Sequence, residues 1–298
     1  MLIQTVIDHI KEYHKGVFEG KQIDEQTTRD KVLYGNPHQE CTGIITTCWA
    51  SVDVIREAAK RGANLIIAHE ALFWNHGDHT DWLQEENNQS FLAKKKLLDE
   101  AGIVVWRDHD YIHSGIPMED GSYTDGIFYG VADKLGWTQY ITKDIHHPLH
   151  FTIPKTTVKE LADFLIQKLQ LNGVKIIGNK NSTVEKIRIP FHILGDARDS
   201  IQEADQENIN CYLTMEVVDF TLAEYIRDSS MLGMDKAIIG MGHFNLEEPG
   251  MEYMITYLPT AVKADIPCAY ISPGICMITE HDSTESTYRS CINKKRIR

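Results

Sequence analysis

Short apolar segments alternate with helical segments of about ten residues, and this alternation limits the possible folds more than any other feature of the chain. In the first half, strands are predicted at residues 43–47, 64–68 and 103–106. Helices are predicted between them at 51–60 and 90–100, with Ser51 as a cap of the first and Gly62 as its stop. Such an order is typical of βαβ units and of a parallel or mixed sheet.

The same alternation returns in the second half of the chain. Strands are predicted at 149–153, 174–177, 184–193, 211–214, 237–240 and 268–272, and helices at 124–136, 156–170, 217–228 and 249–258. Residues 1–15 form a further amphipathic helix, followed by a polar, irregular connector over 18–42. We therefore expect an α/β protein with two lobes, residues 1–145 and 146–298, each a mixed sheet flanked by helices, with a site in the cleft between them.

Composition and charge exclude several classes of protein. The formal charge is −13, which argues against sequence-independent binding to nucleic acid or to anionic membranes. The basic cluster at the C-terminus, Lys294, Lys295, Arg296 and Arg298, is interpreted as a solvated tail. The sequence has no apolar run of about 18 residues and no signal-peptide pattern. Its six cysteines form no C-x-x-C pair, so a reducing cytoplasm is the expected location.

Side chains that can bind metals follow three of the predicted strands. His69 and Glu70 follow the strand at 64–68, and His243 and Glu247 follow the strand at 237–240. The third group is Asp108, His109, Asp110 and His113, after the strand at 103–106. A single residue of this kind after a strand is usually a solvated loop residue. Three groups, each after a buried strand, can instead meet in space, because a sheet brings its strand ends together. Imidazole with carboxylate suits zinc, iron or manganese, so two interpretations stay open: solvated loops, or one shared metal site.

These segments carry a resemblance to the NIF-three-like family, whose members are often called type-2 GTP cyclohydrolase I homologues. Residues 68–73, AHEALF, resemble its Thr/Ala-His-His-Pro-Leu-x-Phe motif, and residues 109–113, HDYIH, resemble its H-T-N-L-D-like run. Residues 242–250, GHFNLEEPG, answer its G-H-x-x-(S/T)-E-x-x-G motif, and residues 211–216 resemble its D-x-Y-I-T-G-E strand. Order and spacing match over about residues 30–260, although the first two motifs are degraded.

The resemblance implies a dinuclear metal centre whose ligands correspond to His69, Glu70, His113, His243 and Glu247. Glu70 stands where the first family motif has its second His, and His113 stands where the second motif ends in Asp. The ligand set therefore keeps three imidazoles and two carboxylates. We therefore expect two divalent ions per subunit, zinc, iron or manganese; loss of one or both ions is the competing interpretation.

The role of His109 stays open at this stage: it is a ligand, or a residue that supports a ligand or acts in acid–base chemistry. Asp108 and Asp110 either orient an imidazole or are solvated, and the solvated interpretation is preferred. Glu248 can compete with Glu247 for the metal. Pro249 is predicted in a first helical turn, which would place Glu247 at a helix N-terminus.

Other candidates are interpreted as loop or packing residues. His146, His147 and His150 are predicted in a surface loop, although they could form an adventitious metal site. His76 and His79 are predicted in an exposed loop, and Trp74, Trp82 and Trp106 in packing. Cys41 and Cys48 lack a distinctive nucleophile context, and phosphate-loop, dinucleotide-loop and G-x-S-x-G motifs are absent.

Two classes of function follow. The first is a metal-dependent hydrolase in which a metal-activated water attacks a nucleotide or another small polar substrate. The second is a non-catalytic metal-binding or regulatory adaptor, because the family is named for a protein partner. The resemblance further implies a toroidal homohexamer built from trimers, with the metal sites facing an internal cavity.

Overall fold

The fold of this chain, a computed structural model, is described for residues 1–18, 20–190, 192 and 197–275. The helices are α1 (Ile3–Tyr13), α2 (Val52–Arg61), α3 (Asp81–Glu85), α4 (Gln89–Ala101), α5 (Asp110–Ser114), α6 (Gly126–Leu135), η1 (Thr138–Tyr140), α7 (Val158–Leu169), α8 (Arg198–Gln206), α9 (Leu222–Met231) and α10 (His243–Val262). The strands are β1 (Val17–Phe18), β2 (Lys21–Gln22), β3 (Val32–Tyr34), β4 (Ile44–Thr47), β5 (Leu65–Ala68), β6 (Val104–Arg107), β7 (Ile116–Pro117), β8 (Tyr123–Thr124), β9 (His150–Thr157), β10 (Lys175–Gly178), β11 (Thr183–Arg188), β12 (Cys211–Thr214), β13 (Ala237–Gly240) and β14 (Cys268–Tyr270). None of these described helices is long and apolar enough to cross a lipid bilayer.

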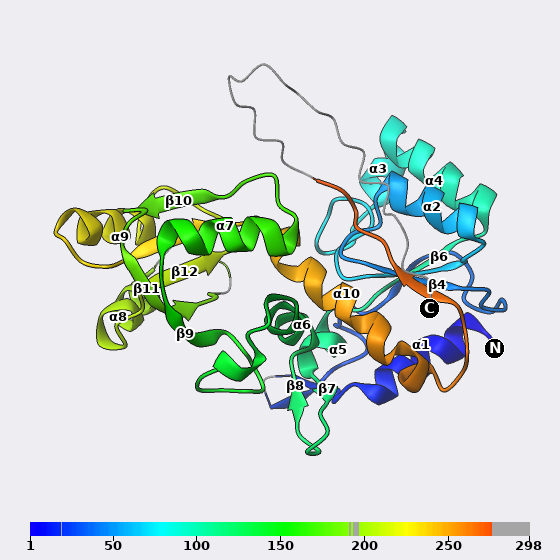
Figure 1. The fold of residues 1–298 in the computed structure, drawn as a ribbon. Coiled ribbons are helices and arrows are strands. Elements are labelled where there is room, and N and C mark those ends of the chain that lie inside the picture. Colours follow the sequence, from blue (N-terminus) through cyan, green and yellow to red (C-terminus); the bar gives the residue numbers. More distant parts are fainter. Residues whose placement is uncertain (19, 191, 193–196, 276–298) are drawn as a thin grey trace.

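Two mixed five-stranded sheets confirm the predicted fold class. The first sheet has the order β14-β4-β5-β6-β3, with β14, β4, β5 and β6 parallel and β3 antiparallel to β6. The second has the order β10-β13-β12-β11-β9, with β11, β12 and β13 parallel and both outer strands antiparallel. Figure 1 shows the two sheets side by side, each with its own flanking helices.

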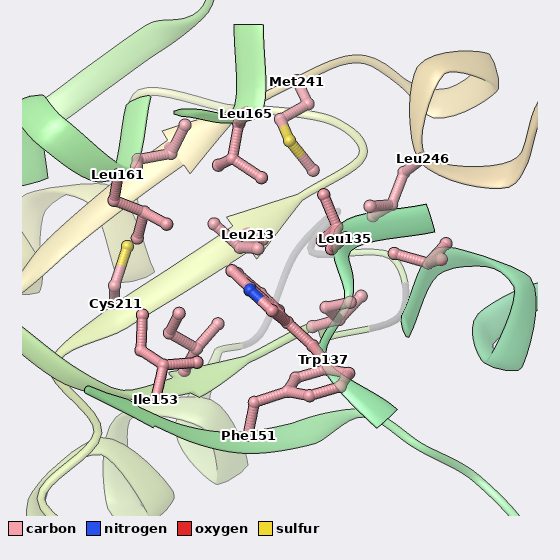
Figure 2. Packing of buried hydrophobic residues seen from close by; sticks show 14 of the residues in the cluster. Leu135, Trp137, Phe151, Ile153, Leu161, Leu165, Cys211, Leu213, Met241 and Leu246 are labelled. Atoms are coloured by element: carbon pink, nitrogen blue, oxygen red, sulfur yellow. The ribbon is translucent and has the colours of Figure 1, made fainter. Parts of the chain in front are cut away.

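The central strands are buried along their whole length because both faces of each sheet are covered. In the first sheet, Ile44 and Val104 pack toward α1 and α10, whereas Ile45 and Val105 pack toward α2 and α4. The second sheet is covered on one face by α6 and α7 and on the other by α8 and α9. In Figure 2, Leu161 of α7 and Leu213 of β12 lie in this second core with Trp137.

Helix α10 joins the two sheets. It starts directly after β13 of the second sheet, passes between the lobes and packs against α1 of the first (Figure 1). It crosses α6 very closely, since a Cβ at Gly130 would lie 2.5 Å from Gly250 Cα and one at Gly250 would lie 2.4 Å from Ile127 Cα. This glycine-lined crossing sets the first turns of α10 against the start of α6, where the candidate ligands are found.

Several predicted boundaries need correction. The helix expected at 249–258 begins at His243, so Pro249 lies in its interior rather than in its first turn. Burial of the helix between the lobes outweighs the hydrogen bond that proline removes. The connector at 18–42 contains β2 and β3, and helix α9 begins at Leu222 rather than 217.

The division at residue 145 stays a prediction. Strand β14, from the predicted C-terminal lobe, pairs with β4 of the first sheet, so the end of the described chain returns to that sheet. The predicted basic tail lies outside the described residues.

Candidate metal centre

The candidate ligands meet where strand ends of both sheets face each other. His69 and Glu70 follow β5, and His109 and His113 follow β6, all in the first sheet. His243 and Glu247 lie on the first two turns of α10, which starts beyond the end of β13 in the second sheet. The structure thus brings the five ligands predicted from the sequence, together with His109, into one cluster.

Short distances define this cluster. Nε2 of His243 lies 3.3 Å from Oε1 of Glu70 and 3.2 Å from Oε2 of Glu247. Nε2 of His69 lies 3.8 Å from Oε1 of Glu247. The His113 ring is edge-on to the His69 ring, with 5.0 Å between centroids. Ligand atoms of His69, Glu70 and Glu247 all lie within 4.8 Å of one another, as do those of His69, His109 and His113.

All four histidines of the cluster are held through the same ring nitrogen. Each Nδ1 faces an oxygen acceptor: Asp108 O at 3.0 Å from His69, Asp110 Oδ1 at 2.9 Å from His109, Asp125 Oδ2 at 2.8 Å from His113, and Glu216 Oε1 beside His243. A carbonyl or carboxylate oxygen only accepts, so each imidazole donates its Nδ1–H. In each ring Nε2 is then the nitrogen that faces the cluster and could bind a metal ion, which is the arrangement usual for metal-binding histidines.

One of these Nε2 atoms is an orphan. The His69 side chain is fully buried, and its Nε2 has no hydrogen-bond partner among the described residues. Leaving such an atom unpaired is costly, so a further partner is expected at this point. Imidazole nitrogen beside carboxylate oxygen is a donor set that fits zinc, iron or manganese.

Contacts between opposite charges shift the pKa values of three residues in the cluster. Burial by itself raises the pKa of Glu70, but the hydrogen bond with His243 and the charges of His69 and Arg107 bring it below its ordinary value. Burial opposes a charge on His243, yet its contacts with Glu247 and Glu70 raise its pKa to about 11. For His113, Asp125 outweighs burial and raises the pKa to about 9.

Arg107 was not foreseen from the sequence. This fully buried guanidinium donates to Oε2 of Glu70 at 2.9 Å, to Oδ2 of Asp78 at 3.1 Å and to the carbonyl oxygens of His69 and His76. These hydrogen bonds hold the loop after β5 next to the cluster, and the guanidinium charge neutralises part of the charge of Glu70. Only Oε1 of Glu70 is therefore directed toward His243.

Burial and contacts bear on four other candidate residues. Asp108 is fully buried, so its interpretation as a solvated residue is wrong; burial and the nearby Asp30 raise its pKa well above the ordinary value. Asp110 is the orienting partner of His109. Glu248 accepts from the Ser272 hydroxyl at 3.0 Å. Cys48 is a buried thiol 3.8 Å from Glu247 whose pKa is raised by burial and by the carboxylates, so it is a poor nucleophile.

The remaining histidines lie mostly outside the cluster. His150 lies in β9 rather than in a loop, and its group with Glu203 and Glu207 is already neutralised by Lys143 and Arg188. His146 is exposed, as expected. His192 contacts Glu216 at the outer side of His243 and forms a further group of possible ligands with them. Trp106 is buried as predicted, whereas Trp74 and Trp82 are about half exposed.

The fold and this cluster define a class of α/β protein in which strand ends of two mixed sheets gather imidazoles and carboxylates suited to divalent metals. The chain belongs to the Duf34/NIF3 (NGG1p interacting factor 3) family, whose model matches residues 19–106 and 117–272. The match is interrupted at 107–116, the segment that carries Arg107, His109 and His113.

Two relatives and a solved structure match most of the chain. The chain is 22% identical over 240 residues to a GTP cyclohydrolase 1 type 2 homolog of Clostridium acetobutylicum, covering 78% of this chain and 81% of that protein. It is likewise 22% identical over 227 residues to the homolog of Clostridium perfringens, covering 73% and 78%. Its fold is similar to the crystal structure of a Bacillus cereus protein related to NIF3, with a TM-score of 0.62, 12% identity and coverage of 91% and 96%.

Proposed function

We propose that this chain binds two divalent metal ions, zinc, iron or manganese, through His69, Glu70, His113, His243 and Glu247, and acts as a metal-dependent hydrolase. The observation that supports this most is the common orientation of the histidines, whose Nδ1 atoms are all held by oxygen acceptors. The orphaned Nε2 of His69 gives independent support, because it needs a partner that the described residues do not supply.

The residues of the chain have distinct tasks in this proposal. Asp125 and Glu216 fix the rings of His113 and His243, which keeps their Nε2 atoms aimed at the centre. Arg107 holds Glu70 in place from behind. Bound there, divalent ions would lower the pKa of a water molecule and polarise a carbonyl or phosphoryl oxygen of the substrate.

A small polar substrate, such as a nucleotide, suits this site. About a quarter of the His243 side chain is exposed, and it is flanked on its outer side by the half-exposed His192 and by Glu216. A substrate can therefore reach the cluster from this side. The names of the relatives point toward a nucleotide, although the chain has no phosphate-loop motif. We expect the protein in the cytoplasm.

An activity screen tests the enzymatic part of the proposal. Phosphoesters, cyclic nucleotides and GTP are incubated with the metal-loaded protein, with and without a chelator, and product formation is measured by chromatography. We expect turnover of at least one of these substrates, lost with chelator and restored by added metal. Tight metal binding without turnover on any of them contradicts the hydrolase and favours the adaptor.

We also propose that the protein forms the homohexamer implied by the family resemblance. Light scattering of the purified protein is expected to give the mass of six chains of 34.0 kDa each. A monomer at micromolar concentration contradicts this assembly.

A further inference from the structure

We propose that the two metal positions are chemically different: His69, His109 and His113 form a three-imidazole position, and Glu70, His243 and Glu247 form a mixed position. This inference rests on the proposed function and adds His109 as a ligand. The single available nitrogen of His69 and the placement of His109 support this division.

The free nitrogen of His69 can serve only one ion. Its Nδ1 is bonded to the carbonyl of Asp108, so Nε2 alone is available, although His69 belongs to two groups of possible ligands. Without His69, the group around Glu70 and Glu247 is still completed by His243, whose Nε2 lies within 3.3 Å of both carboxylates. The other group would keep only two imidazoles. Assigning His69 to it gives each ion three ligands.

His109 is built into this position by its surroundings. Its ring stacks on that of His69, with 4.6 Å between centroids and 9° between planes, and lies 5.2 Å from that of His113. Asp30 accepts from the backbone N–H of His109 and of Asp110, which fixes the start of α5. Asp110 in turn holds His109 Nδ1, so the free Nε2 is offered beside those of the other two histidines.

Glu247 links the two positions. One of its oxygens, Oε1, is the nearest carboxylate to His69 Nε2 at 3.8 Å, and the other, Oε2, lies 3.2 Å from His243 Nε2. Each oxygen thus faces a different position. Glu70 directs Oε1 toward His243, while its Oε2 accepts from Arg107.

The two donor sets favour different metals. Three imidazoles suit zinc, whereas one imidazole with two carboxylates suits iron or manganese. His109 and His113 lie in residues 107–116, which the family model leaves unmatched, so these two ligands are inferred from their contacts in this structure. We therefore expect a mixed-metal centre with zinc at the first position and iron or manganese at the second.

Metal content of single variants tests the division. Full-length protein is incubated with one equivalent of zinc and an excess of manganese, desalted and measured by mass spectrometry, as wild type, His109→Ala, Glu70→Gln and the exposed control His38→Ala. Wild type and control should retain one zinc and one manganese per chain. His109→Ala should lose zinc and keep manganese, and Glu70→Gln should lose manganese and keep zinc.

X-ray absorption at the zinc edge tests the same division on wild-type protein, so it does not depend on whether the variants fold. Wild-type protein loaded with one equivalent of zinc should show three imidazole ligands. Zinc bound by fewer imidazoles, or retention of both metals by folded His109→Ala, overturns the division while leaving the two-metal proposal intact. A wild-type protein that binds no metal overturns the proposed function itself.

Discussion

Replacing Arg107 by leucine should destabilise the protein by about 3–5 kcal/mol, because a buried carboxylate loses its partner. The guanidinium is fully buried and bonds Glu70, Asp78 and two backbone carbonyls. Leucine fills part of the space but pairs with none of these groups. Urea unfolding of the metal-free protein at pH 7, followed by circular dichroism, measures the change.

The control for this variant is Arg61→Leu. Arg61 forms a partly exposed pair with Glu57 on α2, so its loss should change stability by only about 0.5 kcal/mol. A double variant, Arg107→Leu with Glu70→Gln, should recover part of the loss, since the unpaired charge at residue 70 is then removed. An Arg107→Leu protein as stable as Arg61→Leu would contradict the role of this ion pair.

Acidification should destabilise the protein through His14, a residue at the end of α1. Its side chain is fully buried, and neither ring nitrogen has a hydrogen-bond partner among the described residues, although Nδ1 lies 3.8 Å from Oδ1 of the buried Asp108. Burial lowers the pKa of His14 to about 3. The unfolded chain binds this proton near pH 6.5 and the folded protein does not. The contribution of His14 to stability is therefore complete above pH 6.5 and falls by about 1.4 kcal/mol for each pH unit below it, down to pH 3.

Comparison with His14→Leu isolates this effect, because leucine does not titrate. Urea unfolding of metal-free protein between pH 6.5 and pH 4.5 should give a steeper loss for wild type than for His14→Leu. The exposed variant His38→Leu should behave like wild type. Equal slopes for wild type and His14→Leu would show that His14 is protonated in the folded protein.

Most strands of the two five-stranded sheets could be predicted because the signals are local. A strand buried on both faces is a continuous apolar run, as at Leu65–Ala68, and the Ser51 cap and Gly62 stop of α2 are short-range patterns. The length of α10 was not predicted, because Pro249 reads locally as a helix start. Only the close crossing at Gly130 and Gly250, a tertiary contact, shows why the helix continues through it.

The candidate ligands could be located because they directly follow buried strands. Their partners could not. Asp125 and Glu216 are ordinary acidic residues in the sequence, and their role is defined only by the ring nitrogens that they face. Arg107 ends an apolar strand and points to the loop after another strand, and Asp108 has the look of a loop residue although it is buried. Contacts between distant segments decide each of these cases.

Elemental analysis of protein purified without a chelating tag tests the central claim most directly. The protein is expressed untagged, incubated with zinc, iron and manganese, desalted, and its metal content is measured by mass spectrometry. The arrangement of four imidazoles around Glu70 and Glu247 predicts two divalent ions per chain. A folded protein that retains no divalent metal under these conditions would contradict it.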